Sequence, residues 1–194
     1  MPTPIETPPA NLARLTEIER GATAEAAMVL FDSLRAVQLE TMFGSWRGSD
    51  LETGHPLDGL LERLGWHGKR FEGPEDVHPL VFEKPGGELF SVNPSMIPIS
   101  LFIRHAALFR RPAVSRLFKI FLGVLRTNKP QARLRMTEFR GVLTATMIYD
   151  TLPINDIFRM VDQDTLVGVM DLRGGAEPFM FVLRREGQAE GVVM

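Results

Sequence analysis

The motif Gly44-Ser45-Trp46-Arg47-Gly48 is the clearest indication of the fold, because it places a large indole between two residues that have no side chain. Its alternation predicts a β-strand with Trp46 on one face and Arg47 on the other. Glycine inside a strand is typical of a close backbone approach. We therefore predict the first strand of a barrel, in which Trp46 closes one end and its indole N–H reaches a partner. The alternatives are a Trp46 that is simply buried in a core and one that also lines a ligand cavity.

Helical and strand patterns follow one another along the rest of the chain. Helical spacing of apolar residues occurs in residues 11–21, 23–37, 56–64, 99–109 and 113–125, with Thr23 as an N-cap and Pro112 between the last two helices. Strands are predicted at 66–71, 80–84, 88–92, 133–139, 142–149, around 161, and at 165–171 and 179–184. The C-terminal third therefore predicts an antiparallel meander.

The composition limits the classes of function. The 194 residues carry 24 acidic and 22 basic side chains, and a net charge of -2 argues against nucleic acid as a partner. The absence of cysteine excludes disulfides, thiol nucleophiles, iron–sulfur clusters and Cys-containing zinc sites. Residues 1–10 lack the charged start and apolar core of a signal peptide, and no apolar run is long enough to span a bilayer. We expect a cytoplasmic protein.

Several further motifs resemble a known family. The chain resembles the GXWXG family through residues 44–48, Thr53-Gly54-His55-Pro56-Leu57, residues 65–71 and His78-Pro79-Leu80. It also resembles the small domain of unknown function that usually follows, through Arg140-Gly141, residues 147–150, Leu152-Pro153-Ile154 with Asp156, Phe158-Arg159 and residues 168–171. The resemblance covers roughly residues 25–186. We expect a flexible N-terminal segment (1–22), one barrel domain (23–186) and a tail (187–194). Within the barrel domain, 23–92 form the GXWXG half, 93–130 a helical insertion and 131–186 the strand meander.

The opening Gly-x-Trp also resembles calycin barrels, namely lipocalins, fatty-acid-binding proteins and nitrobindins. This resemblance implies an α+β, mainly antiparallel β fold, a lipocalin-like barrel with N-terminal and mid-chain helices. In lipocalins an arginine of the last strand packs on the Trp, and Arg184 stands where that contact is expected. A nitrobindin-like haem needs a late histidine, but none follows His105, so we expect no cofactor. His55 with Asp58 lacks an obvious third ligand, which favours a capping role over a metal site.

Polar residues gather after the strand that ends at Tyr149. Asp150, Asp156 and Arg159 follow Tyr149 closely, and such groups at a barrel mouth could orient or protonate a ligand. The simpler interpretation is a surface ion pair between Asp156 and Arg159 that caps a turn. In the same way, Lys69-Arg70 could clamp a carboxylate or lie on a solvated strand edge. The chain has no nucleophile elbow, phosphate loop or dinucleotide fingerprint.

These observations predict a barrel that binds a small, largely apolar molecule such as a fatty acid or a terpenoid. The expected ligand-binding residues are Trp46, Trp66, Phe71, Met147, Tyr149, Asp150, Phe158, Met170, Phe181 and Arg184. The alternative is an isomerase or cyclase of an apolar substrate, with Asp150, Asp156 or His55 as acid or base. Besides the small apolar ligand, candidate partners are a membrane surface contacted weakly by residues 99–125 and a second copy in a homodimer.

Overall fold

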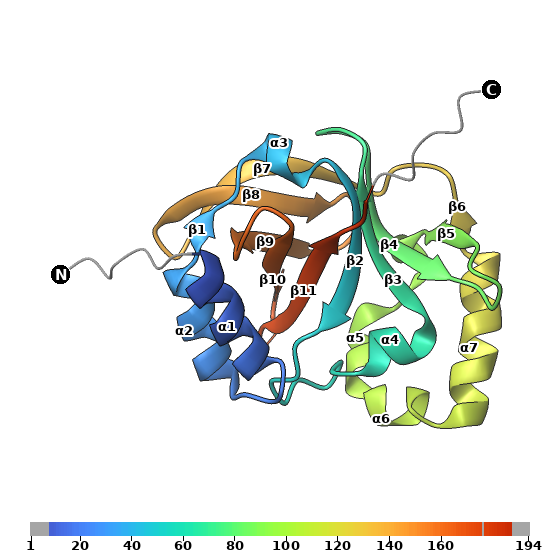
Figure 1. Ribbon diagram of the computed structural model, residues 1–194. Coiled ribbons are helices and arrows are strands. Elements are labelled where there is room, and N and C mark those ends of the chain that lie inside the picture. Colours follow the sequence, from blue (N-terminus) through green and yellow to red (C-terminus); the bar gives the residue numbers. More distant parts are fainter. Residues whose placement is uncertain (1–7, 176, 188–194) are drawn as a thin grey trace.

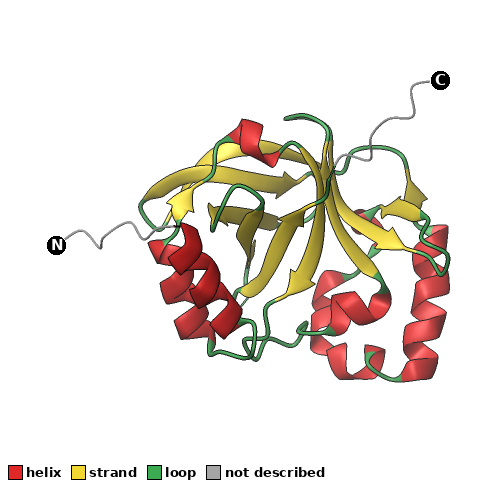
Figure 2. Ribbon diagram, viewed as in Figure 1, coloured by secondary structure: helices red, strands yellow, loops and turns green. Residues whose placement is uncertain are grey.

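The structure is a computed structural model that describes residues 8–175 and 177–187. Within these residues eight antiparallel strands close into a barrel (Figures 1 and 2). The ring runs β3-β2-β11-β10-β9-β8-β7-β4 and returns to β3. Its strands are β2 (Gly44–Asp50), β3 (Trp66–Phe71), β4 (Val77–Glu83), β7 (Ala132–Phe139), β8 (Val142–Tyr149), β9 (Ile154–Met160), β10 (Thr165–Leu172) and β11 (Phe179–Arg185). The expected calycin-like barrel is confirmed.

Two seams join the N-terminal strands of the barrel to the C-terminal ones. At the first seam β2 pairs with β11 over five residue pairs, from Asp50 opposite Phe181 to Trp46 opposite Arg185. At the second seam β4 meets β7 through a single pair, Val77 opposite Ala132. The two seams therefore differ in length, although both close the same interior.

Three short strands of the described residues lie outside the ring. β1 (Arg35–Ala36) pairs with β9, whereas β5 (Leu89–Val92) extends the sheet from β4 and β6 (Arg126–Thr127) pairs with β5. The tight turn between β7 and β8 uses Arg140 and Gly141, both with positive φ (52° and 76°). This is the hairpin expected from the sequence, since paired positive φ values suit the twist of the flanking strands.

Two N-terminal helices cover the outer face of β9–β11. They are α1 (Pro8–Ile18) and α2 (Ala24–Ser33). Thr23 is the N-cap of α2, and its side chain accepts a hydrogen bond from the N–H of Ala26 (3.2 Å). Leu15 of α1 is fully buried in the cluster that these helices form with the sheet. The expectation of a flexible segment over residues 1–22 is therefore wrong for α1; residues 1–7 lie outside the described residues, as do 188–194 of the expected tail.

The remaining helices lie at the two ends of the barrel (Figure 1). The short α3 (Leu39–Met42) precedes β2. At the other end lie α4 (Leu60–Leu64), the 3₁₀ turn η1 (Pro94–Met96), α5 (Ile99–Arg104), α6 (Ala106–Phe109) and α7 (Pro112–Val124). Pro112 occupies the first turn of α7, where its missing N–H costs no hydrogen bond. No helix among the described residues has the length and apolar character needed to cross a bilayer.

Strand β9 is the main element that the sequence patterns did not predict. It contains Asn155, Asp156 and Arg159, residue types that are rare in a buried strand. The structure buries both Asp156 and Arg159 nonetheless, one on each face of the barrel wall. These polar residues interrupt the apolar pattern by which a buried strand is recognised in a sequence, so β9 could not be predicted from the pattern.

Candidate functional site

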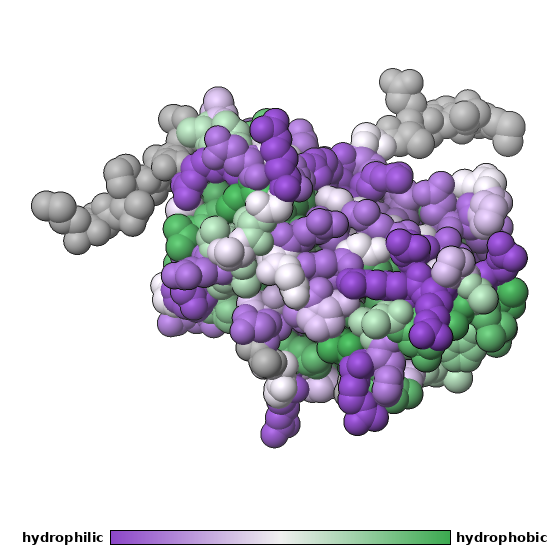
Figure 3. Space-filling view, turned by 90° about the horizontal axis from the view of Figure 1, so that it is seen from below, coloured by the Kyte–Doolittle hydropathy of each residue, from purple (hydrophilic) through white to green (hydrophobic). Residues whose placement is uncertain are grey.

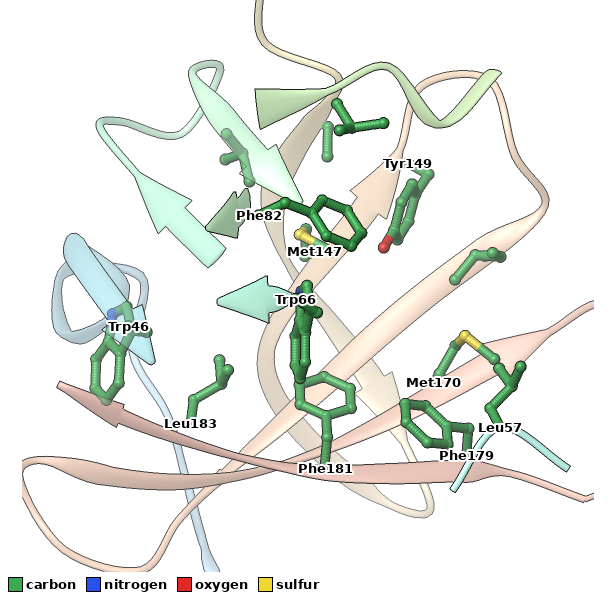
Figure 4. Packing of buried hydrophobic residues seen from close by; sticks show 14 of the residues in the cluster. Trp46, Leu57, Trp66, Phe82, Met147, Tyr149, Met170, Phe179, Phe181 and Leu183 are labelled. Atoms are coloured by element: carbon green, nitrogen blue, oxygen red, sulfur yellow. The ribbon is translucent and has the colours of Figure 1, made fainter. Parts of the chain in front are cut away.

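Trp46 closes the end of the barrel beside α3. Its side chain is fully buried, and its Nε1 donates a hydrogen bond to the carbonyl oxygen of Met42 (2.7 Å). Figure 4 shows Trp46 set apart from the aromatic group around Trp66. The predicted plug and its N–H partner are both present, but Trp46 does not reach the cavity described below.

The arginine that packs on this plug is Arg185, not Arg184. The guanidinium of Arg185 lies 4.2 Å from the centre of the Trp46 ring and donates to the carbonyl oxygens of Thr41 and Phe43. Arg184 points outward and pairs with Glu19 (2.6 Å). The expectation fails by one residue, and in a strand one residue turns a side chain to the opposite face.

The second glycine of the motif makes room for the other tryptophan. A side chain at Gly48 would lie 2.2 Å from the ring of Trp66, so the indole occupies the space that Gly48 leaves. A side chain at Gly68, which has φ +152°, would lie 1.9 Å from the carbonyl oxygen of Trp46. The motif therefore shapes both ends of the barrel, because it supplies one tryptophan and accommodates the other.

A cavity of about 70 Å³ lies between the barrel interior and the covering helices. Its helical wall comes from α4, α5 and α7 and the turns beside them, with Leu61, Phe102 and Phe118 among the contributors. Its barrel wall consists of Trp66, Lys69, Leu80, Phe82, Tyr149, Ile154, Asp156, Met170, Phe179 and Phe181, with Leu152 from the turn between β8 and β9. The lining is thus almost wholly apolar, with one lysine, one aspartate and one tyrosine as its polar members.

Lys69 and Asp156 form a buried ion pair in this lining. Lys69 Nζ lies 2.7 Å from Asp156 Oδ2, and both side chains are only 2–3% exposed. Lys69 Nζ also donates to the carbonyl oxygen of Pro79 (3.2 Å) and lies 4.9–5.9 Å from the ring centres of Trp66, Tyr149 and Phe181. Such an aromatic enclosure suits an ammonium group, which is stabilised over ring faces.

Two buried polar atoms of the lining have no hydrogen-bond partner among the described residues. They are Asp156 Oδ1 and the indole Nε1 of Trp66. Burial raises the pKa of Asp156, while the charge of Lys69 opposes that shift. Burial also raises the pKa of Tyr149, with a further contribution from Asp156, so the phenol stays neutral and can donate. Its hydroxyl oxygen points toward the middle of the aromatic group in Figure 4. The residues that line the cavity thus carry an acceptor and two donors.

A β-bulge places Lys69 inside the barrel. The pairing of β3 with β4 shifts register on both sides of Gly68, so Trp66, Lys69 and Phe71 are all buried. Strict alternation from Trp66 would have turned Lys69 outward. The sequence signal that was available is Gly68 itself, because a glycine inside a strand often marks a bulge, and bulges redirect side chains next to functional sites.

The predicted ligand-binding residues divide into three groups. Trp66, Tyr149, Met170 and Phe181 line the cavity. Phe71, Met147 and Phe158 are buried in the barrel interior but contribute nothing to the cavity lining. Trp46, Arg184 and Asp150 lie elsewhere, so the structure does not bring the expected set together in one place.

Asp150 and Arg159 lie outside the cavity. Asp150 is an exposed residue that pairs with Arg133 (3.1 Å). Arg159 is buried on the outer face of β9, under α2, where its guanidinium lies 5.3 Å from the ring centre of Phe31. Asp156 and Arg159 are three positions apart on one strand and therefore face opposite sides. The surface pair between them that we considered from the sequence does not form.

His55 has a structural role in the loop before α4. Oδ2 of Asp58 accepts hydrogen bonds from the backbone N–H groups of Thr53, Gly54 and His55 (2.7–2.9 Å). The His55 ring packs 5.4 Å from the ring of Phe179, and burial lowers its pKa. This matches the capping interpretation, and His55 is not part of the cavity lining.

One additional carboxyl group faces inward at the helical end. The alternation that turns Trp46 and Gly48 inward also turns Asp50 inward, at the end of β2. Burial, followed by the charge of Glu62, raises its pKa from 3.8 to about 8. The sequence alone does not single out Asp50, because an aspartate at a strand end is an ordinary turn signal.

Glu72, Asp76 and His78 form a titratable cluster near the β3–β4 turn, and their ligand atoms lie within 4.8 Å of one another. The guanidinium of Arg70 already binds Glu72 (2.9 Å). Burial and then the charge of Arg70 lower the pKa of His78. This arrangement is more typical of an ion-pair network at a hairpin than of a metal centre.

Comparison with known proteins agrees with this architecture. The family model described as "GXWXG protein" matches residues 29–87, and the model described as "Domain of unknown function (DUF4334)" matches residues 130–185. The chain is similar to a protein from Thermomonospora curvata whose crystal structure is known. The two sequences are 30% identical, and the structures match with a TM-score of 0.67 over 92% of this chain and 99% of that chain. No curated protein matches the sequence.

The fold and the cavity define a calycin-like barrel with a helical cover. The chain belongs to the GXWXG family and carries the companion C-terminal domain of unknown function. A closed barrel of this family is compatible with ligand binding, but neither family description names a ligand.

Proposed function

We propose that the protein binds a small, largely apolar molecule of terpenoid or fatty-acid type in the cavity under α4, α5 and α7. The observation that carries the proposal is the pair of unpartnered atoms, Asp156 Oδ1 and Trp66 Nε1, on residues that line an apolar cavity. A buried polar atom without a partner costs about 1–3 kcal/mol. A ligand with one polar end would recover that cost and bury its apolar part.

The polar end of the ligand is a neutral hydroxyl or carbonyl group. Lys69 and Asp156 already balance each other's charge, so a ligand carboxylate would add an uncompensated buried charge. A hydroxyl could donate to Asp156 Oδ1 and accept from the N–H of Trp66, whereas a carbonyl could accept from Trp66 or Tyr149. Among the two ligand types, a terpenoid alcohol or ketone fits this pattern better than a fatty-acid anion.

Entry of such a ligand requires the cover to move. The cavity of about 70 Å³ is smaller than the roughly 150 Å³ that accommodates a benzene molecule in an engineered protein core. α5 and α6 are helices of six and four residues, separated at His105. Short helices have few internal hydrogen bonds, so we expect α5 and α6 to move more easily than the barrel strands when a ligand enters.

Calorimetric titration with farnesol and with farnesoic acid tests the proposal. These two ligands share a chain and differ in the polar end. We expect saturable binding of farnesol, with weaker binding of the acid. The variant with both Lys69→Met and Asp156→Leu keeps an apolar lining and should lose this preference. Failure of folded wild-type protein to bind either ligand would contradict the carrier function.

Proton transfer to a bound ligand is the second candidate function. The pKa of Asp156 favours it, because burial in the apolar cavity raises this pKa against the opposing charge of Lys69. In an isomerisation, Asp156 would add its proton at one carbon of an alkene and recover a proton from another carbon. The reaction then needs no co-reactant. Asp150 and His55, the other acids considered from the sequence, do not line the cavity.

Asp156→Asn separates binding from catalysis. Loss of a general acid lowers turnover by about a hundredfold or more, while the binding of an apolar ligand changes little. The measurement is mass spectrometry of apolar alkenes incubated with wild type and variant. Leu143→Ser, on an exposed position of β8, serves as the folding control. If wild type leaves all tested alkenes unchanged, only the binding function stands.

A further inference from the structure

The helical cover has an unusual distribution of charge. Residues 89–137 contain no aspartate or glutamate, although the whole chain has more acidic than basic residues. The same segment contains nine basic residues: Arg104, Arg110, Arg111, Arg116, Lys119, Arg126, Lys129, Arg133 and Arg135. Several of them pair with acidic residues from elsewhere, for example Arg126 with Glu88 (2.9 Å). The side chains of Arg104, Arg111, Arg116 and Lys119 have no hydrogen-bond or ion-pair partner in the part of the chain that the structure describes.

α7 exposes an apolar stripe on the same side as two of these cations. Leu117, Ile120, Phe121 and Val124 follow the i, i+3, i+4, i+7 spacing of one helix face and are 40–78% exposed. In Figure 3 the hydrophobic colour gathers at the edge where α7 lies in Figure 1, beside strongly hydrophilic residues. We call Leu117, Ile120, Phe121 and Val124, with Arg116 and Lys119, the α7 face.

The inner side of the same helices borders the cavity. Phe118 and Leu122 of α7 and Phe102 of α5 line it, and the rings of Phe102 and Phe118 stack at 5.4 Å. The cover is therefore apolar on both sides, and one layer of helix separates the cavity from the α7 face. An apolar molecule that left the cavity through this wall would arrive at the α7 face.

We propose that the α7 face docks on an anionic lipid bilayer. Apolar side chains flanked by Arg and Lys are the pattern of helices that lie in the membrane interface. Anionic lipids attract basic residues close to the surface by about 1 kcal/mol each, or roughly fivefold in binding constant. A second copy of the chain fits less well, because a symmetric dimer through this face would bring Arg116 and Lys119 close to their own copies.

Docking does not depend on the proposed ligand, so it can be tested separately. Purified full-length protein is floated with vesicles of phosphatidylcholine, with and without phosphatidylglycerol. We expect binding to the anionic vesicles, and an approximately 25-fold weaker partition for the double variant Arg116→Gln, Lys119→Gln. The triple variant Leu117→Ser, Ile120→Ser, Val124→Ser should also lose binding. The matched controls are Arg35→Gln with Arg47→Gln for charge, and Val29→Ser with Leu143→Ser for exposed apolar residues.

Three results would overturn the proposal. The first is an absence of flotation of wild type with anionic vesicles. The second is an equal loss of binding in the control variants. The third is a wild-type dimer in solution that the triple variant converts to a monomer, because this would assign the α7 face to a second copy. Thermal melts check that each variant is folded, and the charge variant tests docking even if the triple variant is not.

Discussion

The two ends of the barrel each contain a tryptophan with a cation beside it, but they differ in how their polar atoms are satisfied. At one end Trp46 donates to Met42, and Arg185 lies 4.2 Å from its ring. At the other end Trp66 has no hydrogen-bond partner among the described residues, and Lys69 lies 5.7 Å from its ring. The same residue types thus build a finished plug at one end and an incomplete site at the other.

The difference favours the helical end as the ligand site that we propose. Native proteins satisfy the great majority of their buried polar groups, so an unsatisfied group needs an explanation. The Trp46 end is explained by structure alone. The helical end keeps an unpartnered indole N–H, an unpartnered carboxylate oxygen and the inward-facing Asp50, and a ligand explains at least the first two.

Asp50→Asn should produce the largest change, and it should depend on pH. The folded-state pKa of Asp50 is about 8 against an ordinary value of 3.8, so the folded protein holds a proton that the unfolded chain releases. Its contribution to stability is therefore full below about pH 4 and is lost as the pH rises through 8. The loss is on the order of 5 kcal/mol. We expect the variant to lack this decline in denaturant titrations between pH 5 and 9. An unchanged decline, equal to that of the exposed control Asp171→Asn, would show that Asp50 is not protonated.

Lys69→Met should lower the free energy of unfolding by about 3–5 kcal/mol, because Asp156 is left as a buried charge without a partner. The loss should shrink at low pH, where Asp156 takes up a proton. Adding Asp156→Leu should restore most of the stability while ligand binding stays impaired. Urea denaturation with a parallel binding assay checks both. A double variant as unstable as the single one would mean that the ion pair is needed for the fold.

Trp46→Phe and Trp66→Phe should separate the two ends directly. The first leaves the Met42 carbonyl without its donor and should cost about 1–3 kcal/mol of stability with unchanged ligand affinity. The second removes an N–H that has no protein partner, so stability should change by less than about 1 kcal/mol while affinity falls. Equal losses of stability in the two variants would contradict the difference between a hydrogen-bonded Trp46 and an unpartnered Trp66.

Arg185→Ala and Arg184→Ala should show the smallest difference. Arg185 loses its contact with Trp46 and two hydrogen bonds to backbone carbonyls, which we expect to cost about 1–2 kcal/mol. Arg184 loses a partly exposed pair with Glu19, worth about 0–1 kcal/mol. Thermal melts of the two single variants compare them. A larger loss of melting temperature for Arg184→Ala than for Arg185→Ala would indicate that Arg184, not Arg185, packs on Trp46.

The sequence predicted the architecture well where local patterns and the overall fold agree. The Trp46 plug, the Thr23 cap, the Arg140-Gly141 turn and the α7 start at Pro112 each follow from one local rule. The rules for caps, turns and alternation need no knowledge of distant residues. The barrel could therefore be predicted from such elements together with the motif resemblance.

The site could not be predicted in the same way, because it depends on two local exceptions. The bulge at Gly68 turns Lys69 inward, whereas regular alternation of side chains would turn it outward. Asp156 lies in β9, a buried strand whose polar residues hide its strand pattern in the sequence. Lys69 and Asp156 lie 2.7 Å apart in space but on strands separated by much of the chain. Each residue alone is typical of a solvated surface, and only the ion pair between them offsets the free-energy cost of burying the two charges.

The unequal seams of the barrel set an order for its opening. β2 and β11 share five residue pairs, whereas β4 and β7 share one, so separation at Val77 and Ala132 breaks far fewer backbone hydrogen bonds. Local fluctuations that expose the interior should therefore begin at this second seam while the first stays paired. In hydrogen–deuterium exchange, amides around Val77 and Ala132 should lose protection before those of β2 and β11, and the wall of the barrel would open like a cylinder slit along one line.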